Sequence, residues 1–359
     1  ASGAADLLRA IENAPAILGG EKPVEDLGVR ALDDYRLEIR LARPVPYFLD
    51  ILTNTVASPV HKSSLAAGGG FSKPGTTITN GPYRLVDQAP GANIRLARNP
   101  HYWDSSSVTF DEVRYEFVTD ENAEFTRFRA GELDVTNTVP EQRFEQLASE
   151  PDSGLQHRAW LATFYFTFNT DRGPLHDKPA LREALSLAID RAAITSSVTR
   201  AGQVPAFSLV PAGVSNYTPA AYEWQAEPRE QRIARARSLY AGAGYSAARP
   251  LRLRLLYNEN ELIQKVCIAI ASMWKEGLGV EVELIQMEFK AYLAARADPA
   301  QWDVVRVGWT ADYNDASTFL DTMTRDSPQN FGRWVNADYA SLLAAAASLA
   351  MAQASPAGV

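Results

Sequence analysis

Several features that define whole classes of protein are scarce or absent in this sequence. The 359 residues contain one cysteine, Cys267, which cannot form a disulfide within the chain and does not identify a compartment. No apolar run approaches the roughly 18 residues of a membrane-spanning helix. The longest, at 340–354, is rich in Ala and interrupted by Ser and Gln. We therefore expect neither a disulfide framework nor a membrane span in this chain.

Positive charge is limited as well. The chain has 35 basic and 43 acidic residues, and its net charge at pH 7 is −8. The basic residues form no block and no basic amphipathic helix, so we expect no nucleic-acid partner. The composition, 46% apolar and 22% charged, is that of a globular protein. The length favours two or more lobes.

The signatures of cofactor sites and catalytic sites are missing. The segment GFSKPGT at 70–76 resembles half of a phosphate loop but lacks the Lys after its second Gly. No G-x-G-x-x-G or G-x-S-x-G motif is present. Cys267 stands among apolar residues of a predicted helix, which favours a core position over a nucleophile. The histidines have no metal-ligand spacing; they are His61, His101, His157 and His176. We expect no cofactor, no metal and no catalytic residue.

The most regular pattern begins at residue 251. Strands alternate with helices there: strands at 251–257, 280–286 and 302–307, and helices at 260–277 and 288–297. This β-α-β-α-β series indicates parallel strands with right-handed crossovers. Ligands of such sheets lie beyond the carboxyl ends of the strands. The stretch RVGWTADYNDASTFLD at 306–321 leaves the last strand at that position, so Asp312 is predicted to face a site.

Weaker patterns predict the other elements. We expect hairpins at 29–41 and 83–97, strands at 114–118 and 164–168, helices at 47–52, 123–131, 181–189 and 227–245, and a loop at 66–80. Aromatic residues are dense near the last strand. Trp302 and Phe319 are predicted to lie in the core. Trp309 and Tyr313 lie past the strand end, where a pocket wall and a core position are equally good interpretations.

Several motifs in the same order resemble those of the family 5 extracellular solute-binding proteins, the receptors of peptide-type ABC importers. They are NGPYRL (80–85), ARNPHYWD (97–104), GELD (131–134), FNT (168–170), PLHD (174–177) and LREALSLAIDR (181–191). Three more resemble the oligopeptide- and murein-peptide-binding members: DLGVRALDD (26–34), PVPYF (44–48) and GWTADYN (308–314). The resemblance covers residues 10–345.

The resemblance implies an α/β fold of the two-lobed periplasmic-binding-protein type (type II) with an extra small domain. Residues 1–60 would be part of the small domain, 61–165 part of the first lobe, and 166–359 most of the other lobe. Family members extend beyond both ends of this sequence, so we expect the fold to be incomplete here. The start, ASGAADLL, has no initiator Met and no targeting signal, and the end, SLAMAQASPAGV, departs from the family.

The resemblance also implies a function. It predicts a monomeric, non-enzymatic periplasmic receptor, or a lipid-anchored one in a Gram-positive cell. The receptor would capture short peptides of three to five residues in the cleft between the lobes. It would deliver them to an ABC permease in the inner membrane.

Site residues follow from the resemblance position by position. Asp312 matches an Asp that binds the peptide amine, with Trp309 and Tyr313 excluding water around it. Gly308 and Thr310 match an edge that pairs with the peptide backbone.

Residues for the rest of the peptide also follow from matching positions. Asn137 and Thr138 would serve the opposite side of the cleft. Arg306 and Arg296 match arginines that bind the peptide carboxylate.

Three positions depart from the family pattern. Phe289 replaces a Trp that lines a side-chain pocket. Ile263 stands where the oligopeptide binders have a His for longer peptides, and Thr199 where they have a Lys for the shortest ones. These changes favour tripeptides, whose carboxylate Arg306 would bind.

Alternatives remain open at this point. Arg306 could form an ion pair with Asp303 or Asp312 inside the lobe, and Arg296 could cap helix carbonyls. The same fold could bind an oligosaccharide, a metal chelate or haem, and Trp309 and Asn314 would suit a sugar. A hydrolytic enzyme using the cleft carboxylates would need a nucleophile or base near Asp312, and none is visible.

Overall fold

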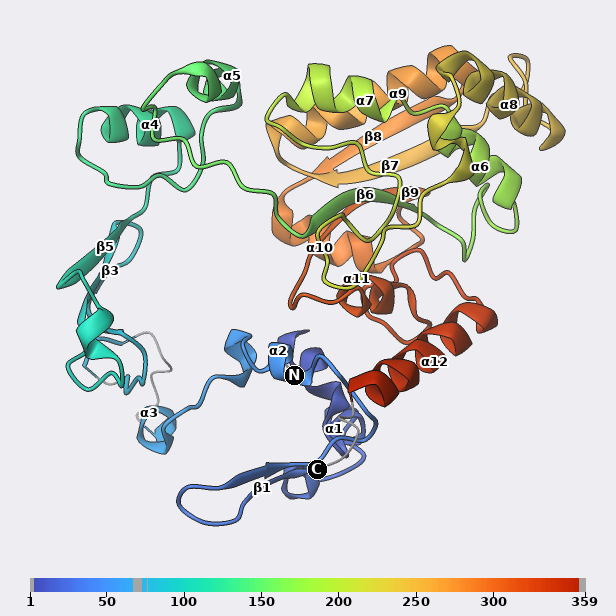
Figure 1. Cartoon of the computed structure of the whole chain (residues 1–359). Helices are drawn as coiled ribbons and strands as arrows, with labels where there is room; N and C mark the ends of the chain where they lie inside the picture. The colour runs from blue at the N-terminus through green and yellow to red at the C-terminus, as the bar shows by residue number, and fades with distance from the viewer. Residues whose placement is uncertain (1–2, 67–72, 76, 355–359) are drawn as a thin grey trace. The chain divides into compact units, whose positions relative to one another are not determined.

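The computed structural model (Figure 1) describes residues 3–66, 73–75 and 77–354. The chain folds into two compact units. Unit 1 comprises Ala1–Val56 and Gln156–Val359, and unit 2 comprises Ala57–Leu155. The three-part domain division expected from the resemblance stays a prediction.

Unit 1 contains most of the regular structure. Its main elements are β6 (Ala162–Phe168), α6 (Pro179–Leu187), α8 (Arg229–Gly242), β7 (Arg252–Asn258), α9 (Glu261–Leu278), β8 (Glu281–Met287), α10 (Phe289–Ala297), β9 (Val304–Thr310) and α12 (Ala337–Ala354). Its shorter elements are η1 (Gly3–Ala10), α1 (Ala14–Leu18), η2 (Val24–Asp26), β1 (Val29–Ala31), β2 (Leu37–Ile39), α2 (Phe48–Ile51), α7 (Arg191–Ala193), η6 (Ile194–Thr199), η7 (Glu223–Ala226), α11 (Ser317–Leu320) and η8 (Asp321–Met323). The short turn η3 (Thr55–Ala57) lies at the boundary of the two units.

The centre of unit 1 is a four-stranded sheet in the order β6-β9-β7-β8. β7 is parallel to both β8 and β9, whereas β6 is antiparallel to β9. Helices α9 and α10 connect the three parallel strands in sequence order. The predicted β-α-β-α-β series and the predicted strand at 164–168 are confirmed.

Helices cover this sheet on both faces (Figure 1). One core, between the sheet and helices α6, α8 and α9, contains Leu255, Cys267 and Trp274. The other core, on the α10 side, contains Tyr292 and Trp302. The predicted core positions of Cys267 and Trp302 are confirmed, and both are fully buried. Both faces of this sheet are therefore buried, as is usual for parallel strands.

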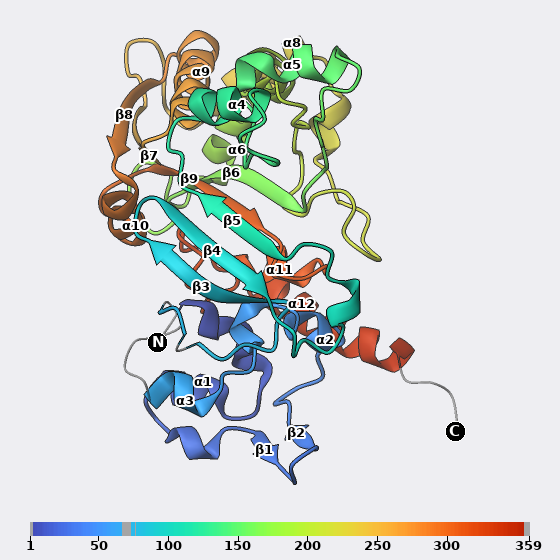
Figure 2. The same ribbon diagram turned by 90° about the vertical axis from the view of Figure 1, so that its left-hand side faces the viewer.

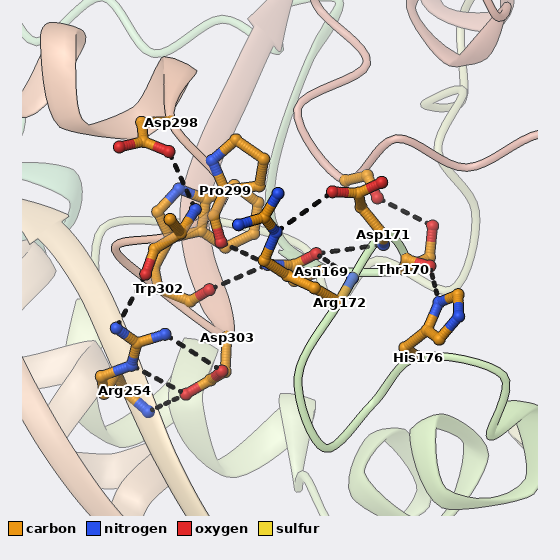
Figure 3. A network of polar contacts seen from close by, with 12 residues as sticks. Asn169, Thr170, Asp171, Arg172, His176, Arg254, Asp298, Pro299, Trp302 and Asp303 are labelled. Atoms are coloured by element: carbon orange, nitrogen blue, oxygen red, sulfur yellow. Dashed lines mark hydrogen bonds and ion pairs between the residues drawn. The ribbon is translucent and has the colours of Figure 1, made fainter.

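A buried asparagine joins the end of β6 to the segment before β9 (Figure 3). The Nδ2 group of Asn169 donates to the carbonyl oxygens of Pro299 (2.6 Å) and Trp302 (3.0 Å). Its Oδ1 atom accepts hydrogen bonds from the backbone N–H groups of Asp171 and Arg172. All polar atoms of this buried side chain are therefore satisfied, so it adds rigidity without an unpaired group.

Asp303, the residue just before β9, has a buried carboxylate that is held by hydrogen bonds (Figure 3). Asp303 Oδ2 accepts from the backbone N–H of Arg254 (2.8 Å) and from its guanidinium Nε (3.2 Å). The backbone N–H of Asp303 donates in return to the carbonyl of Arg254 (3.0 Å). The register of β9 against β7 is thus set at this end of the strand.

The first 56 residues form a small cluster of their own within unit 1. Strands β1 and β2 pair antiparallel around the turn at Asp33, and the helix α2 follows. The predicted hairpin at 29–41 and helix at 47–52 are confirmed. Phe48 and Ile51 lie in a small core, against which Tyr47 and Tyr313 also pack.

Unit 2 is built on a three-stranded antiparallel sheet, seen face-on in Figure 2. Its elements are α3 (Lys62–Ala66), β3 (Tyr83–Ala89), β4 (Asn93–Arg98), η5 (Ser105–Ser107), β5 (Glu112–Glu116), α4 (Glu121–Arg129) and α5 (Glu141–Ser149). Gly91 makes the β3–β4 turn with φ of +73°, and Gly131 follows α4 with φ of +75°. The predicted hairpin at 83–97, strand at 114–118 and helix at 123–131 are confirmed. The predicted loop at 66–80 and the segment at 70–76 lie partly outside the described residues.

Candidate functional site

Strand β9 changes its pairing half-way along. β6 pairs with all of β9, from Val304 to Thr310. β7 pairs with β9 only at Val304 and Val305. Within the described residues, no strand pairs with residues 306–310 on the side away from β6. We refer to this side of residues 306–310 as the open edge.

The hydrogen-bond pattern shows which residues face the open edge. The backbone N–H of Ala311 donates to Leu161 (2.8 Å), and the carbonyl of Asp303 accepts from Asn169 (2.9 Å). In an antiparallel pair the bonded positions alternate, so the odd-numbered residues of β9 bond to β6. The N–H and C=O groups of Gly308 and Thr310 therefore point to the open edge. At Arg306, the carbonyl on this edge accepts a hydrogen bond from Tyr292 Oη.

Asp312 follows the open edge after one residue. Its carboxylate is half-buried and makes no hydrogen bond or ion pair with any residue that the structure describes. Partial burial raises the pKa of Asp312 because the charged form loses solvation. The backbone N–H of Asp312 donates to Thr318 Oγ1 (3.2 Å). The arrangement is that of a carboxylate able to receive a cation.

The two aromatic residues beside Asp312 are each half-buried. Trp309 packs against a small core that contains the fully buried Phe319, and its indole Nε1 donates to Thr318 Oγ1 (3.1 Å). Tyr313 stacks on Tyr47, with ring centroids 4.8 Å apart and planes at 7°. Both rings therefore belong partly to a core. The predicted core position of Phe319 is confirmed.

Arg306 is half-buried on the face of the sheet that also carries Phe164 of β6. Its guanidinium lies over the Phe164 ring, 4.9 Å from the centroid, and NH1 donates to Asn258 Oδ1 (3.4 Å). Burial lowers the pKa of Arg306. The alternative ion pair with Asp303 or Asp312 is wrong, because Asp303 is bonded to Arg254 and Asp312 has no partner among the described residues. The guanidinium thus has no carboxylate in this part of the structure.

Gly308 lies directly beneath the Phe164 ring. A Cβ atom at this position would come within 2.7 Å of Phe164 Cδ1. Any larger residue here would force the ring to move, and Phe164 is 69% exposed, so glycine allows the close approach seen in this structure.

The remaining predicted site residues of unit 1 lie on helices. Arg296, on α10, lies between the rings of Tyr292 (5.3 Å) and Phe331 (4.1 Å), and its buried Nε has no hydrogen-bond partner in the described chain. Phe289 begins α10 and is exposed. Ile263 lies in the first turn of α9 and packs against the larger core. Their predicted roles in ligand binding stay predictions.

Asn137 and Thr138 lie in unit 2, and both are exposed. The backbone N–H of Asn137 donates to Glu124 Oε1 (2.8 Å). Glu124 belongs to α4, so this hydrogen bond attaches the segment to that helix.

Comparison with known families and proteins adds to this geometry. The profile of the bacterial extracellular solute-binding proteins, family 5 Middle, matches residues 4–331. This chain belongs to family 5 of the bacterial extracellular solute-binding proteins. The resemblance seen in the motifs is thereby confirmed.

Relatives of this family 5 protein include named peptide-binding proteins. It is 36% identical over 341 residues to the periplasmic murein peptide-binding protein MppA of Escherichia coli, covering 95% of this chain and 63% of the relative. It is 38% identical over 336 residues to the periplasmic oligopeptide-binding protein OppA of Salmonella typhimurium, covering 93% and 62%. This family 5 protein thus spans less than two thirds of the length of these relatives.

Solved structures confirm the predicted fold class. The structure of the E. coli murein tripeptide binding protein MppA matches with a TM-score of 0.84 at 36% identity, over 96% of this chain and 67% of the other. Haemophilus influenzae OppA in complex with RPPGFSPFR matches with a TM-score of 0.82 at 32% identity, over 96% and 68%.

Other chemistry in this family 5 protein is limited. Within the described residues, no group of three or more His, Cys, Asp or Glu side chains could hold a metal ion, and no helix has the length and apolar character of a membrane span. Burial raises the pKa of the Cys267 thiol to about 12, so it is not a reactive thiolate at neutral pH.

Four side chains around the site were missed by sequence reasoning: Tyr47, Phe164, Ser317 and Thr318. Phe164 had a signal, since a strand of alternating residues predicts which of them share a face. Ser317 and Thr318 also had one, because hydroxyls just after a DYND turn often bond back to the turn. Tyr47 had none, since its contact is made between distant parts of the chain.

Proposed function

We propose that this protein is the substrate-binding receptor of an ABC peptide importer and that it captures short peptides at the open edge of β9. The observation that carries the proposal is Asp312, a half-buried carboxylate without a partner in the described chain, placed beside the unpaired groups of Gly308 and Thr310. The named functions of the relatives support the same class of ligand.

Peptides of different sequence share an ammonium group, a backbone and a carboxylate, so a receptor for varied peptides must bind these three. We assign the ammonium to Asp312. We expect Trp309 and Tyr313 to reduce the solvent that competes for the carboxylate, because the two rings are held by packing against two small cores next to Asp312 in the chain. A paired charge in a partly desolvated site is bound more tightly than the same pair in water.

The backbone of the peptide would add as a strand to the open edge. Gly308 and Thr310 each offer one N–H donor and one C=O acceptor in the direction away from β6. Main-chain hydrogen bonds of this kind give affinity that does not depend on the side chains of the peptide. Gly308 has no side chain, and the Phe164 ring above it supplies an apolar surface instead.

The carboxylate end falls to Arg306 in this proposal. We assign the peptide amine to Asp312 and the peptide carboxylate to Arg306. Tripeptides are the first choice, because Ile263 and Thr199 stand where the oligopeptide binders have the His and the Lys for peptides of other lengths. Arg296 would serve peptides that extend further, and Phe289 and Ile263 would line side-chain pockets.

We assign Asn137 and Thr138 to the opposite side of the bound peptide, as the resemblance implies. The same reasoning gives a monomeric periplasmic receptor, an inner-membrane ABC permease as its partner, and no catalytic role, cofactor or nucleic-acid ligand. The predicted length range of three to five residues is part of this proposal.

Native mass spectrometry of the purified protein tests the ligand class. We expect mass additions that fragment into short peptides, and added trialanine should displace them. Additions that correspond to an oligosaccharide, a chelate or haem, with no displacement by trialanine, would contradict the proposal.

A further inference from the structure

Two hydrogen bonds at the candidate site end on one buried hydroxyl. Thr318 belongs to the single-turn helix α11 and is 4% exposed. Its Oγ1 accepts from the indole Nε1–H of Trp309 (3.1 Å) and from the backbone N–H of Asp312 (3.2 Å). One oxygen atom thus accepts hydrogen bonds from both the Trp309 ring and the backbone of Asp312, whose carboxylate belongs to the candidate site.

Within the described residues, no polar contact holds the carboxylate of Asp312 directly. It has no hydrogen-bond or ion-pair partner among the described residues, so its position depends on the backbone at Asp312. In the described chain, the only side chain bonded to that backbone is Thr318.

The neighbouring residue is held from the same helix. Tyr313 Oη lies 3.2 Å from Ser317 Oγ, and the Tyr313 ring stacks on Tyr47. The backbone N–H of Ser317 donates in turn to Asp315 Oδ1 (2.8 Å), which closes the turn between Asp312 and α11. The turn is therefore fixed on both sides of Asp312, and Thr318 is the fixed point nearest to it.

We infer that Thr318 is a positioning residue of the candidate site. Its hydroxyl holds both the backbone of Asp312 and the ring of Trp309, and it thereby determines how strongly the site prefers a peptide with a free amine to an N-acetylated one. This inference rests on the proposed function, since it assumes that Asp312 binds the ammonium group.

The inference makes Thr318→Val the decisive change. Val has nearly the shape of Thr but has no hydroxyl, so the packing around α11 is kept while two half-buried donors lose their acceptor. Thr318→Ser keeps the acceptor and loses only a methyl group. Each such hydrogen bond contributes a factor of roughly several in an equilibrium constant. We therefore expect the loss of both to weaken amine recognition about tenfold.

The readout is the ratio of the Kd of N-acetyl-trialanine to the Kd of trialanine, measured by calorimetry on the full chain. We expect a large ratio for wild type, a ratio about tenfold smaller for Thr318→Val, and a wild-type ratio for Thr318→Ser. General loss of folded protein would weaken both peptides equally and leave the ratio unchanged. An unchanged ratio in Thr318→Val, or an equal loss in Thr318→Ser, would overturn the inference.

Amide hydrogen exchange tests the hydrogen bond from the Asp312 N–H to Thr318 in the absence of peptide. The Asp312 N–H should exchange slowly in wild type and in Thr318→Ser, and faster in Thr318→Val. Rapid exchange in wild type would overturn the inference even if Thr318→Val did not fold. A wild type that binds both peptides equally would contradict the proposed amine contact and the inference with it. Equal discrimination by wild type and Thr318→Val would contradict the inference alone.

Discussion

The two halves of β9 differ although they belong to one strand. In the first half, Val304 and Val305 are fully buried and are paired with β6 on one side and β7 on the other. In the second half, Arg306 and Gly308 are half-buried, Thr310 is exposed, and only β6 is paired. The first half packs between two cores. The second half presents backbone groups to the open edge.

This difference arises because β7 stops pairing after Val305. Within a sheet, backbone N–H and C=O groups are consumed by neighbouring strands. Where the neighbour ends, the same groups become available to a ligand of extended conformation. If the proposed site is correct, the first half of β9 serves stability and the second half serves peptide binding, and substitutions should separate the two.

The largest expected effect is a difference between the two halves of β9 in how much a substitution lowers the free energy of unfolding. Val305→Asp would place a carboxylate without a partner in the core on the α10 side, which should lower the free energy of unfolding by at least about 5 kcal/mol or prevent folding. Thr310→Asp also introduces a carboxylate, at the exposed end of the strand, and its cost should be below about 1 kcal/mol. Urea unfolding followed by circular dichroism measures both. Similar losses in the two variants would show that the halves are not distinct.

The next effect separates the halves by binding. Asp312→Asn removes the charge that we assign to the peptide amine. Breaking one side of a buried ion pair costs about 3–5 kcal/mol, or a few hundred- to a few thousand-fold in affinity. We expect trialanine binding to weaken by about that factor. Calorimetry measures it, with Asp326→Asn as a matched loss of one exposed carboxylate.

N-acetylation of the peptide tests whether Asp312 and the amine form one contact. Acetylation should weaken binding to wild type as much as Asp312→Asn does, and it should add little in the variant. The two losses are then strongly non-additive, as expected for partners in a single interaction. Simply additive losses would show that Asp312 does not hold the amine.

Much of this arrangement was predictable from the sequence. The order of strands and helices from 251 to 307 follows from hydrophobic periodicity, and the proposed place of the site, beyond the last strand, follows from the rule for parallel sheets. Where β7 stops pairing was not predictable, since it depends on the register of two strands in space. The alternative ion pair of Arg306 with Asp303 was wrong for a similar reason. Arg254, which bonds Asp303, lies on the adjacent strand, and no sequence spacing reveals that contact.

Contacts made through tertiary packing were the least predictable. Tyr47 reaches Tyr313 across most of the chain, and nothing in either segment indicates the other. The burial of Thr318 follows from the packing of α11, a single turn too short for its sequence pattern to indicate a buried face.

A smaller effect concerns the glycine of the open edge. In Gly308→Ala the new methyl group would lie 2.7 Å from Phe164 Cδ1, so the Phe164 ring, on which Arg306 lies, must shift. We expect a loss of about 1 kcal/mol in the free energy of unfolding. In a Phe164→Ala background the same change should be neutral or slightly stabilising, because Ala restricts the unfolded chain. Equal losses in both backgrounds, measured by urea unfolding, would remove the steric explanation for glycine at this position.

The smallest effect concerns the stability of the peptide-free protein. Partial burial raises the pKa of Asp312 above its value in the unfolded chain, so the folded state holds the proton more readily. The stability from this group is complete below the unfolded pKa and is lost as the pH rises through the folded pKa. At neutral pH the ionised carboxylate therefore lowers the free energy of unfolding, by an amount that solvent screening limits to less than about 1 kcal/mol.

Asp312→Asn removes the charge, so the variant should be slightly more stable than wild type at neutral pH, and the difference should shrink on acidification. Urea unfolding at several pH values measures this difference, with Asp326→Asn controlling for the change in net charge. A variant that is less stable than wild type at neutral pH would mean that Asp312 supports the fold. The separation of stability from binding along β9 would then not include Asp312.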